Sequence, residues 1–103
     1  MLRRSRWGDV IARQLDLFER EHRDVIDEAE DKLEAYNRAE RDEAEELYGD
    51  YVDAVETGTE LLADIRDHYA SRLAEGSDDR YQRAFNRAVE RRWKPFALEI
   101  ENR

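Results

Sequence analysis

The chain has no cysteine, one proline and only four glycines among its 103 residues. Without cysteine it can form neither disulfides nor thiolate metal sites. No more than three apolar residues follow one another, whereas a transmembrane helix needs about 20 and a signal-peptide core about 7–15. We therefore expect a cytoplasmic protein.

Recognisable catalytic motifs are lacking as well. The serines at positions 5, 71 and 77 lie outside any Gly-x-Ser-x-Gly elbow. The glycines are scattered and form no phosphate-binding loop. Acidic residues are so frequent that no catalytic pair stands out. We expect a protein without enzymatic activity and without a cofactor.

Charged residues, in contrast, make up 44% of the chain, and the 27 acids outnumber the 18 bases. The excess lies in residues 9–78, which carry 23 acids and 8 bases. Residues 1–8 have a net charge of +3, and residues 79–103 carry 7 bases and 4 acids. An acidic trunk repels phosphate groups, so nucleic acid could bind only at the basic ends.

The apolar residues recur at steps of three and four, which is typical of amphipathic helices. Residues 9–36 are expected to form one helix, followed by a second apolar stripe that begins at Leu47. Gly76 then separates a trunk, residues 9–75, from a basic amphipathic helix over 78–93 and a tail over 94–103. The predicted packing seam consists of Leu15, Phe18, Val25, Leu33, Leu47, Tyr51, Leu62, Ile65 and Leu73.

The number of helices is the open question of this single all-α domain. Residues 37–46 contain no large apolar side chain, which favours a turn, yet most of them are good helix formers. We favour a long antiparallel hairpin that bends within 38–50 and packs with the C-terminal helix as a three-helix bundle. The alternative is one continuous helix from about residue 9 to 75, about 100 Å long, in a coiled-coil-like dimer. Thr57-Gly58-Thr59-Glu60 is another candidate break.

Two histidines stand one helical turn from a carboxylate, and such pairs bind metals in helical bundles. Glu19 precedes His22 by three residues, and Asp64 precedes His68 by four. A hairpin bent near residue 45 would place the two pairs opposite each other. A divalent-metal site made of these four residues is therefore an alternative to a structural role for the histidines.

The C-terminal helix has a basic face that could bind a partner. The predicted partner-binding residues are Arg80, Arg83, Arg87, Arg91, Lys94, Trp93 and Phe96. Because a polar chain of this length buries little apolar surface alone, we also expect self-association into a homodimer or larger assembly. The resulting hypothesis is an oligomerising or adaptor protein that presents helical surfaces to a protein partner. The alternatives are the metal-binding bundle and a nucleic-acid or anionic-surface adaptor.

Overall fold

The computed structural model describes residues 6–103, and all of their regular secondary structure is helical. The elements are α1 (Gly8–Glu21), α2 (Arg23–Asn37), α3 (Ala44–Ala70), α4 (Ser77–Arg92), the 3-10 turn η1 (Lys94–Phe96) and α5 (Ala97–Glu101). The prediction of an all-α chain is confirmed. Residues 6–103 form five α-helices where three were expected.

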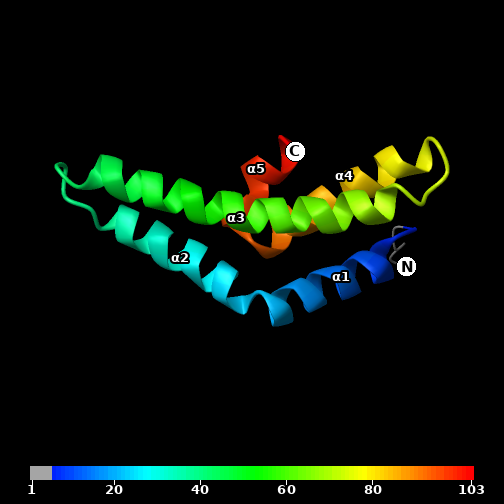
Figure 1. Cartoon of the computed structure of the whole chain (residues 1–103), viewed down its shortest axis with the longest axis horizontal. Helices are drawn as coiled ribbons and strands as arrows, with labels where there is room; N and C mark the ends of the chain where they lie inside the picture. Colours follow the sequence, from blue (N-terminus) through cyan, green and yellow to red (C-terminus); the bar gives the residue numbers. More distant parts are fainter. Residues whose placement is uncertain (1–5) are drawn as a thin grey trace, which may run out of the picture.

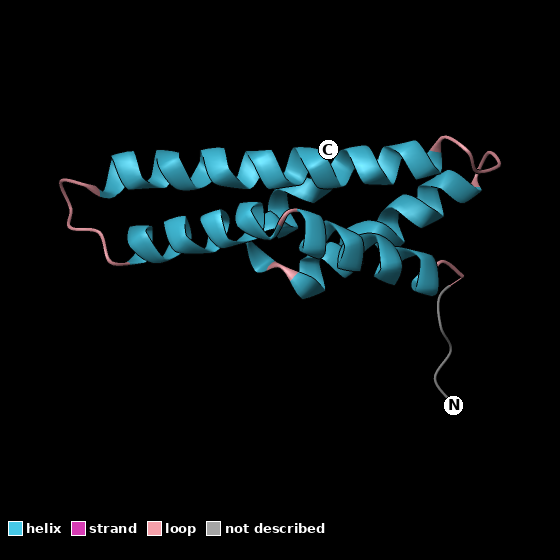
Figure 2. Ribbon diagram, turned by 60° about the horizontal axis from the view of Figure 1, so that its bottom comes forward, coloured by secondary structure: helices cyan, strands magenta, loops and turns pink. Residues whose placement is uncertain are grey.

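Helix α2 runs antiparallel to the first half of the long helix α3, and the two are joined by a loop over residues 38–43 (Figures 1 and 2). Ala29 on α2 and Val55 on α3 are buried between them. The molecule is 50 Å long, half the length of about 100 Å that an unbroken helix over the trunk would need. The polar stretch after Asn37 is thus a turn, as its lack of large apolar side chains indicates.

The first predicted helix is interrupted at His22, whose φ of −127° and ψ of 36° are not helical. Its backbone N–H still donates a hydrogen bond to the Phe18 carbonyl, at 2.8 Å. The interruption lets α2 follow α3 while α1 turns away to pack on α4 (Figure 1). Phe18 consequently meets Trp93, with 5.4 Å between the ring centroids.

Helix α3 continues through Thr57-Gly58-Thr59-Glu60, where the sequence allowed a break. The Thr57 hydroxyl donates to the Asp53 carbonyl one turn earlier, at 3.1 Å, so its polar group is satisfied inside a helix. Gly58 is buried against the ring of Phe96, and its missing side chain makes room for that ring. Tertiary packing outweighs the low helix propensity of glycine here.

The C-terminal segment closes over the middle of the bundle (Figure 1). Trp93 is extended, Pro95 starts a new turn, and Phe96 and Ile100 are buried. Arg66 of α3 is only 2% exposed and anchors this segment. Its Nη1 donates to the Ile100 carbonyl at 3.2 Å and to Asn86 Oδ1 at 3.0 Å, and its Nε donates to Asp67 Oδ1 at 2.8 Å.

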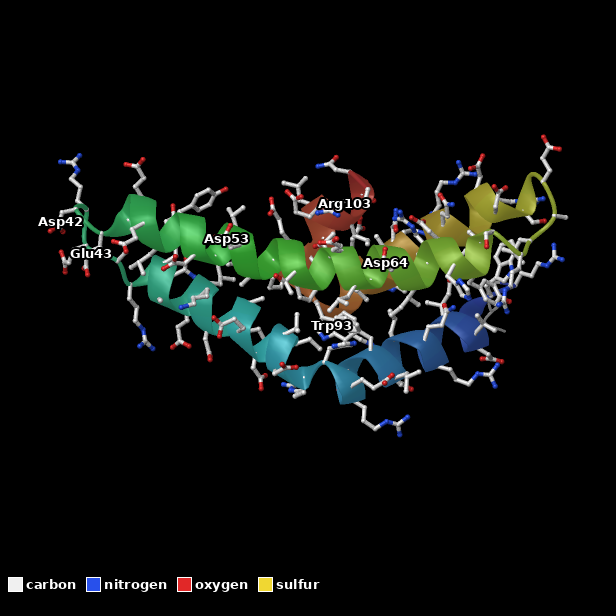
Figure 3. All side chains as sticks on the ribbon, in the orientation of Figure 1. Asp42, Glu43, Asp53, Asp64, Trp93 and Arg103 are labelled. Atoms are coloured by element: carbon white, nitrogen blue, oxygen red, sulfur yellow. The ribbon has the colours of Figure 1, made fainter. Side chains whose placement is uncertain are left out.

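Beyond this closure, α2, the loop and the first half of α3 project as a two-helix extension, which we call the acidic arm (residues 23–57). It carries 14 acids and 4 bases, and Figure 3 shows Asp42 and Glu43 at its tip. The arm makes the radius of gyration 15.4 Å, above the roughly 13 Å of a compact domain of this size. No helix within residues 6–103 combines the length and the apolar character needed to cross a membrane.

Candidate docking surface on helix α4

Helix α4 begins where the sequence predicts a break. Gly76 has a φ of +91°, a conformation that glycine adopts without strain. Its N–H donates to Asp78 Oδ1 at 3.1 Å. Gly76 occupies the N-cap position, and Asp78 and Asp79 lie in the first turn, where the helix dipole favours carboxylates.

One face of α4 is fixed in the core. Tyr81, Phe85 and Val89 are completely buried on it. The Tyr81 hydroxyl donates to Gln14 Oε1 of α1 at 2.9 Å. Burial of the phenol raises the pKa of Tyr81 to about 12. Because this face is held by apolar contacts and a hydrogen bond, the opposite face points to solvent in a defined direction.

That opposite face is a row of exposed arginines, which we call the arginine ridge (Arg80, Arg83, Arg87 and Arg91). At 1.5 Å per residue the row is about 16 Å long. Within residues 6–103, none of the four forms a salt bridge. The nearby Glu90 hydrogen-bonds to the carboxyl of Glu101, which raises the pKa of Glu90. The ridge is thus a strip of positive charge without a salt bridge in the described chain, although Arg87 and Arg91 interact electrostatically with Glu90 and act to lower its pKa.

Next to the ridge lies the α1–α4 groove, a hollow of about 240 Å³ between α1 and α4. Its floor and walls are made of small and aliphatic side chains, with arginines at one end: Gly8, Ile11, Ala12, Leu15, Ala84, Ala88, Arg91 and Arg92. The volume is below the roughly 300–1,000 Å³ of typical small-molecule sites. It has room for one or two apolar side chains.

The arginine end of the groove is held in place by Arg92. Its Nη1 lies 2.8 Å from Asp16 Oδ1 of α1, and its guanidinium lies 5.4 Å from the centroid of the Trp93 ring. These two contacts link the C-terminal end of α4 to α1. Arg91, which also lines the groove, is left facing solvent.

The structure separates the predicted partner-binding residues into three groups. The four ridge arginines lie together on the surface, as their spacing predicts. Trp93 and Phe96 are 6% and 1% exposed and belong to the core, so they are not presented to a partner; Figure 3 shows Trp93 in the middle of the molecule. Lys94 does not continue the ridge, because α4 ends at Arg92. It lines a hollow beside α2 instead.

The residues of the predicted metal site are not brought together as that prediction required. The loop lies at 38–43 and not near residue 45, so the two histidines fall at different levels of the bundle. His22 stacks on Phe18 with 5.3 Å between centroids, and His68 is exposed near the end of α3. Among residues 6–103, no three His, Asp or Glu side chains are grouped so that they could hold a metal ion. Metal binding therefore stays a prediction without geometric support.

No protein-family model, curated protein or solved structure matches this chain. What this surface could bind therefore has to follow from the chemistry of its own residues.

Sequence reasoning missed the contribution of α1 to the groove. The available signal was the pairing of small residues four positions apart, Gly8 with Ala12 and Ala84 with Ala88, since such pairs let a partner approach a helix closely.

Proposed function

We propose that this protein is a non-enzymatic helical adaptor that binds an acidic, amphipathic helix of a protein partner on α4. The observation that carries this proposal is the position of the α1–α4 groove directly beside the arginine ridge. The groove offers an apolar surface and the ridge offers positive charge along the same helix. A partner helix with an apolar stripe flanked by carboxylates matches both features.

A protein helix suits this surface better than nucleic acid does. Duplex DNA is a dense polyanion, and the acidic arm, with 14 acids against 4 bases, would repel it. An apolar groove also gives a phosphate backbone nothing to bind, whereas it can hold a leucine or phenylalanine of a helix. The four arginines supply long-range attraction and the groove supplies the short-range contact.

The test is a titration of the protein into a defined probe at low salt, with fluorescence anisotropy of the probe as the readout. The probe is a labelled helix-forming peptide with leucines along one face and glutamates elsewhere. We expect binding that weakens as salt is added, because the charges are exposed and are screened. A peptide of the same composition with its leucines scrambled should bind at least tenfold more weakly.

Matched variants locate the binding site. Reversal of two ridge charges, Arg87→Glu with Arg91→Glu, should abolish binding of the peptide. The control, Arg72→Glu with Arg103→Glu, makes the same change in net charge at exposed positions outside the ridge and the groove and should leave binding intact. Absence of peptide binding to the wild type, or equal loss in both variants, contradicts the proposal. Tight binding of duplex DNA in place of the peptide would favour the nucleic-acid alternative.

A further inference from the structure

Helix α3 carries a surface opposite in charge to the arginine ridge. Residues 44–65 contain seven acids and no lysine or arginine. Within the described part of the chain, none of these acids forms a salt bridge, whereas α2 pairs Asp27 with Arg23 and Glu28 with Lys32. The acids that share the outer face of α3 are Glu45, Asp53, Glu56 and Glu60, all exposed. Figure 3 shows Asp53 on this helix.

An apolar strip runs beside these acids on the part of α3 that belongs to the arm. One side of the Tyr48 ring contacts Tyr36 of α2, with 5.3 Å between the ring centroids, yet Tyr48 is still 51% exposed. Val52, one turn later, is half-buried. Gly49 lies between them, and a Cβ added there would meet nothing within 4 Å. Among the described elements, Figure 1 shows α2 beside this part of α3, whereas η1 and α5 lie further along the helix. It is therefore an amphipathic acidic helix with one side uncovered.

The two surfaces of one chain complement each other. The acidic face from Glu45 to Glu60 is about 22 Å long, similar to the ridge at about 16 Å. The α1–α4 groove is lined by Ala12 and Ala88 and has room for a side chain such as Tyr48. Within the described chain neither the ridge arginines nor these acids form a salt bridge, so each surface can receive ion-pair partners from another copy.

We infer that the helix bound by α4 is α3 of a second copy of this chain. The acidic face of α3 pairs with the arginine ridge, and Tyr48 enters the α1–α4 groove. Every copy carries both surfaces. Two copies in which α3 of each packs on α4 of the other form a closed dimer, whereas copies joined head to tail form a larger assembly. This inference rests on the proposed function and names the partner for the same surface.

The first measurement is the mass of the full chain in solution, by light scattering or sedimentation at low salt and about 100 µM. We expect a dimer or larger species that dissociates toward monomer as salt is raised, because salt screens the exposed charges. A wild type that is monomeric under these conditions overturns the inference. The proposed function survives that result if the glutamate–leucine peptide still binds.

Charge exchange then tests the pairing itself. The ridge variant is Arg87→Glu with Arg91→Glu, and the arm variant is Glu45→Arg with Glu56→Arg. Each alone should be at least tenfold weaker in self-association, whereas an equimolar mixture should associate again, because the reversed ridge faces the reversed arm. Circular dichroism is the check that both variants remain helical.

The matched control for the arm is Glu21→Arg with Asp31→Arg, which changes two exposed acids outside the acidic face. It should associate like the wild type. The arm variant also leaves the groove of its neighbours vacant, so the peptide should bind it more tightly than it binds the wild type. Undiminished association of the arm variant, or a mixture that stays monomeric, overturns the inference while leaving peptide binding to be judged separately.

Discussion

Gly58 of α3 and Phe96 of η1 are in direct contact, and a β-carbon built on Gly58 would lie 2.5 Å from Cε1 of the Phe96 ring. The ring cannot easily move aside, because Phe96 is 1% exposed and its centroid lies 6.3 Å from that of Trp93. This contact ties the C-terminal segment to the middle of the longest helix. It also explains why a glycine is found inside a helix without ending it.

Gly58→Ala is therefore expected to destabilise the protein. Overpacking costs about 1–3 kcal/mol, which exceeds the gain of about 0.5–1 kcal/mol from removing a helical glycine. The free energy of unfolding from urea melts should fall by about 1–2 kcal/mol. Gly49→Ala is the control: it lies in the same helix with open space around it and should raise stability by about 0.5–1 kcal/mol. Equal effects at both positions would contradict the contact.

A second-site change sharpens this test. Phe96→Leu shortens the side chain that blocks position 58, so it should cost less stability in the Gly58→Ala background than in the wild type. The difference is the coupling energy of a double-mutant cycle, which for residues in contact is about 0.5–3 kcal/mol. A coupling energy near zero would mean that the two positions do not meet.

Replacement of Arg66 by alanine should release the C-terminal segment. The buried Ile100 carbonyl and the partly buried Asn86 Oδ1 would lose their guanidinium donor, and an unsatisfied buried acceptor costs about 1–3 kcal/mol. We expect a loss of at least about 2 kcal/mol in urea melts and faster hydrogen exchange in α5. Arg72→Ala, at an exposed position, should change stability by less than about 0.5 kcal/mol. Unchanged exchange in α5 would show that Arg66 does not hold it.

The apolar periodicity predicted the all-helical class and part of the core, but not the number of helices. Leu15, Phe18 and Leu62 of the predicted seam are almost completely buried. Leu33 and Leu47 are only half-buried, because the acidic arm has two helices and lacks a third to cover them. Periodicity gives the direction in which a side chain points but not whether another helix lies there.

Other features were not predictable because they depend on contacts between distant residues. No turn residue marks the interruption at His22, which follows from α1 packing on α4 while α2 packs on α3. Arg66 has the sequence character of a surface residue, and only its acceptors on α4 and α5 explain its burial. The spacing of the arginines in the sequence predicted the ridge. The groove beside it could not be predicted, because it depends on where α1 packs.

The hydroxyl of Thr59 is buried and has no hydrogen-bond partner among the described residues. Valine has nearly the same shape without the polar group, so Thr59→Val removes a desolvation cost. We expect the variant to be more stable by about 1 kcal/mol in urea melts. Thr59→Ser keeps the hydroxyl and loses a buried methyl group, and it should be less stable by about 1 kcal/mol. A destabilised valine variant would indicate that the hydroxyl is satisfied in solution.

Tyr81 should make the protein sensitive to alkali. Burial raises the pKa of its phenol to about 12 from the ordinary 10.0, so the fold favours the neutral form. The stability this provides is complete below the unfolded-state pKa and is lost as pH rises through the folded-state pKa. Urea midpoints of the wild type should therefore decline between pH 10 and about 12.

Removal of this phenol supplies the comparison. At neutral pH, Tyr81→Phe should cost about 0.5–1.5 kcal/mol, because the hydrogen bond to Gln14 is lost. Above pH 10 the cost should shrink, since the variant has no buried phenol to ionise there, and its urea midpoint should fall less steeply than that of the wild type. Tyr48→Phe, which removes a phenol that is 51% exposed, should follow the wild-type curve. Parallel curves for all three proteins would show that ionisation of Tyr81 does not control alkaline unfolding.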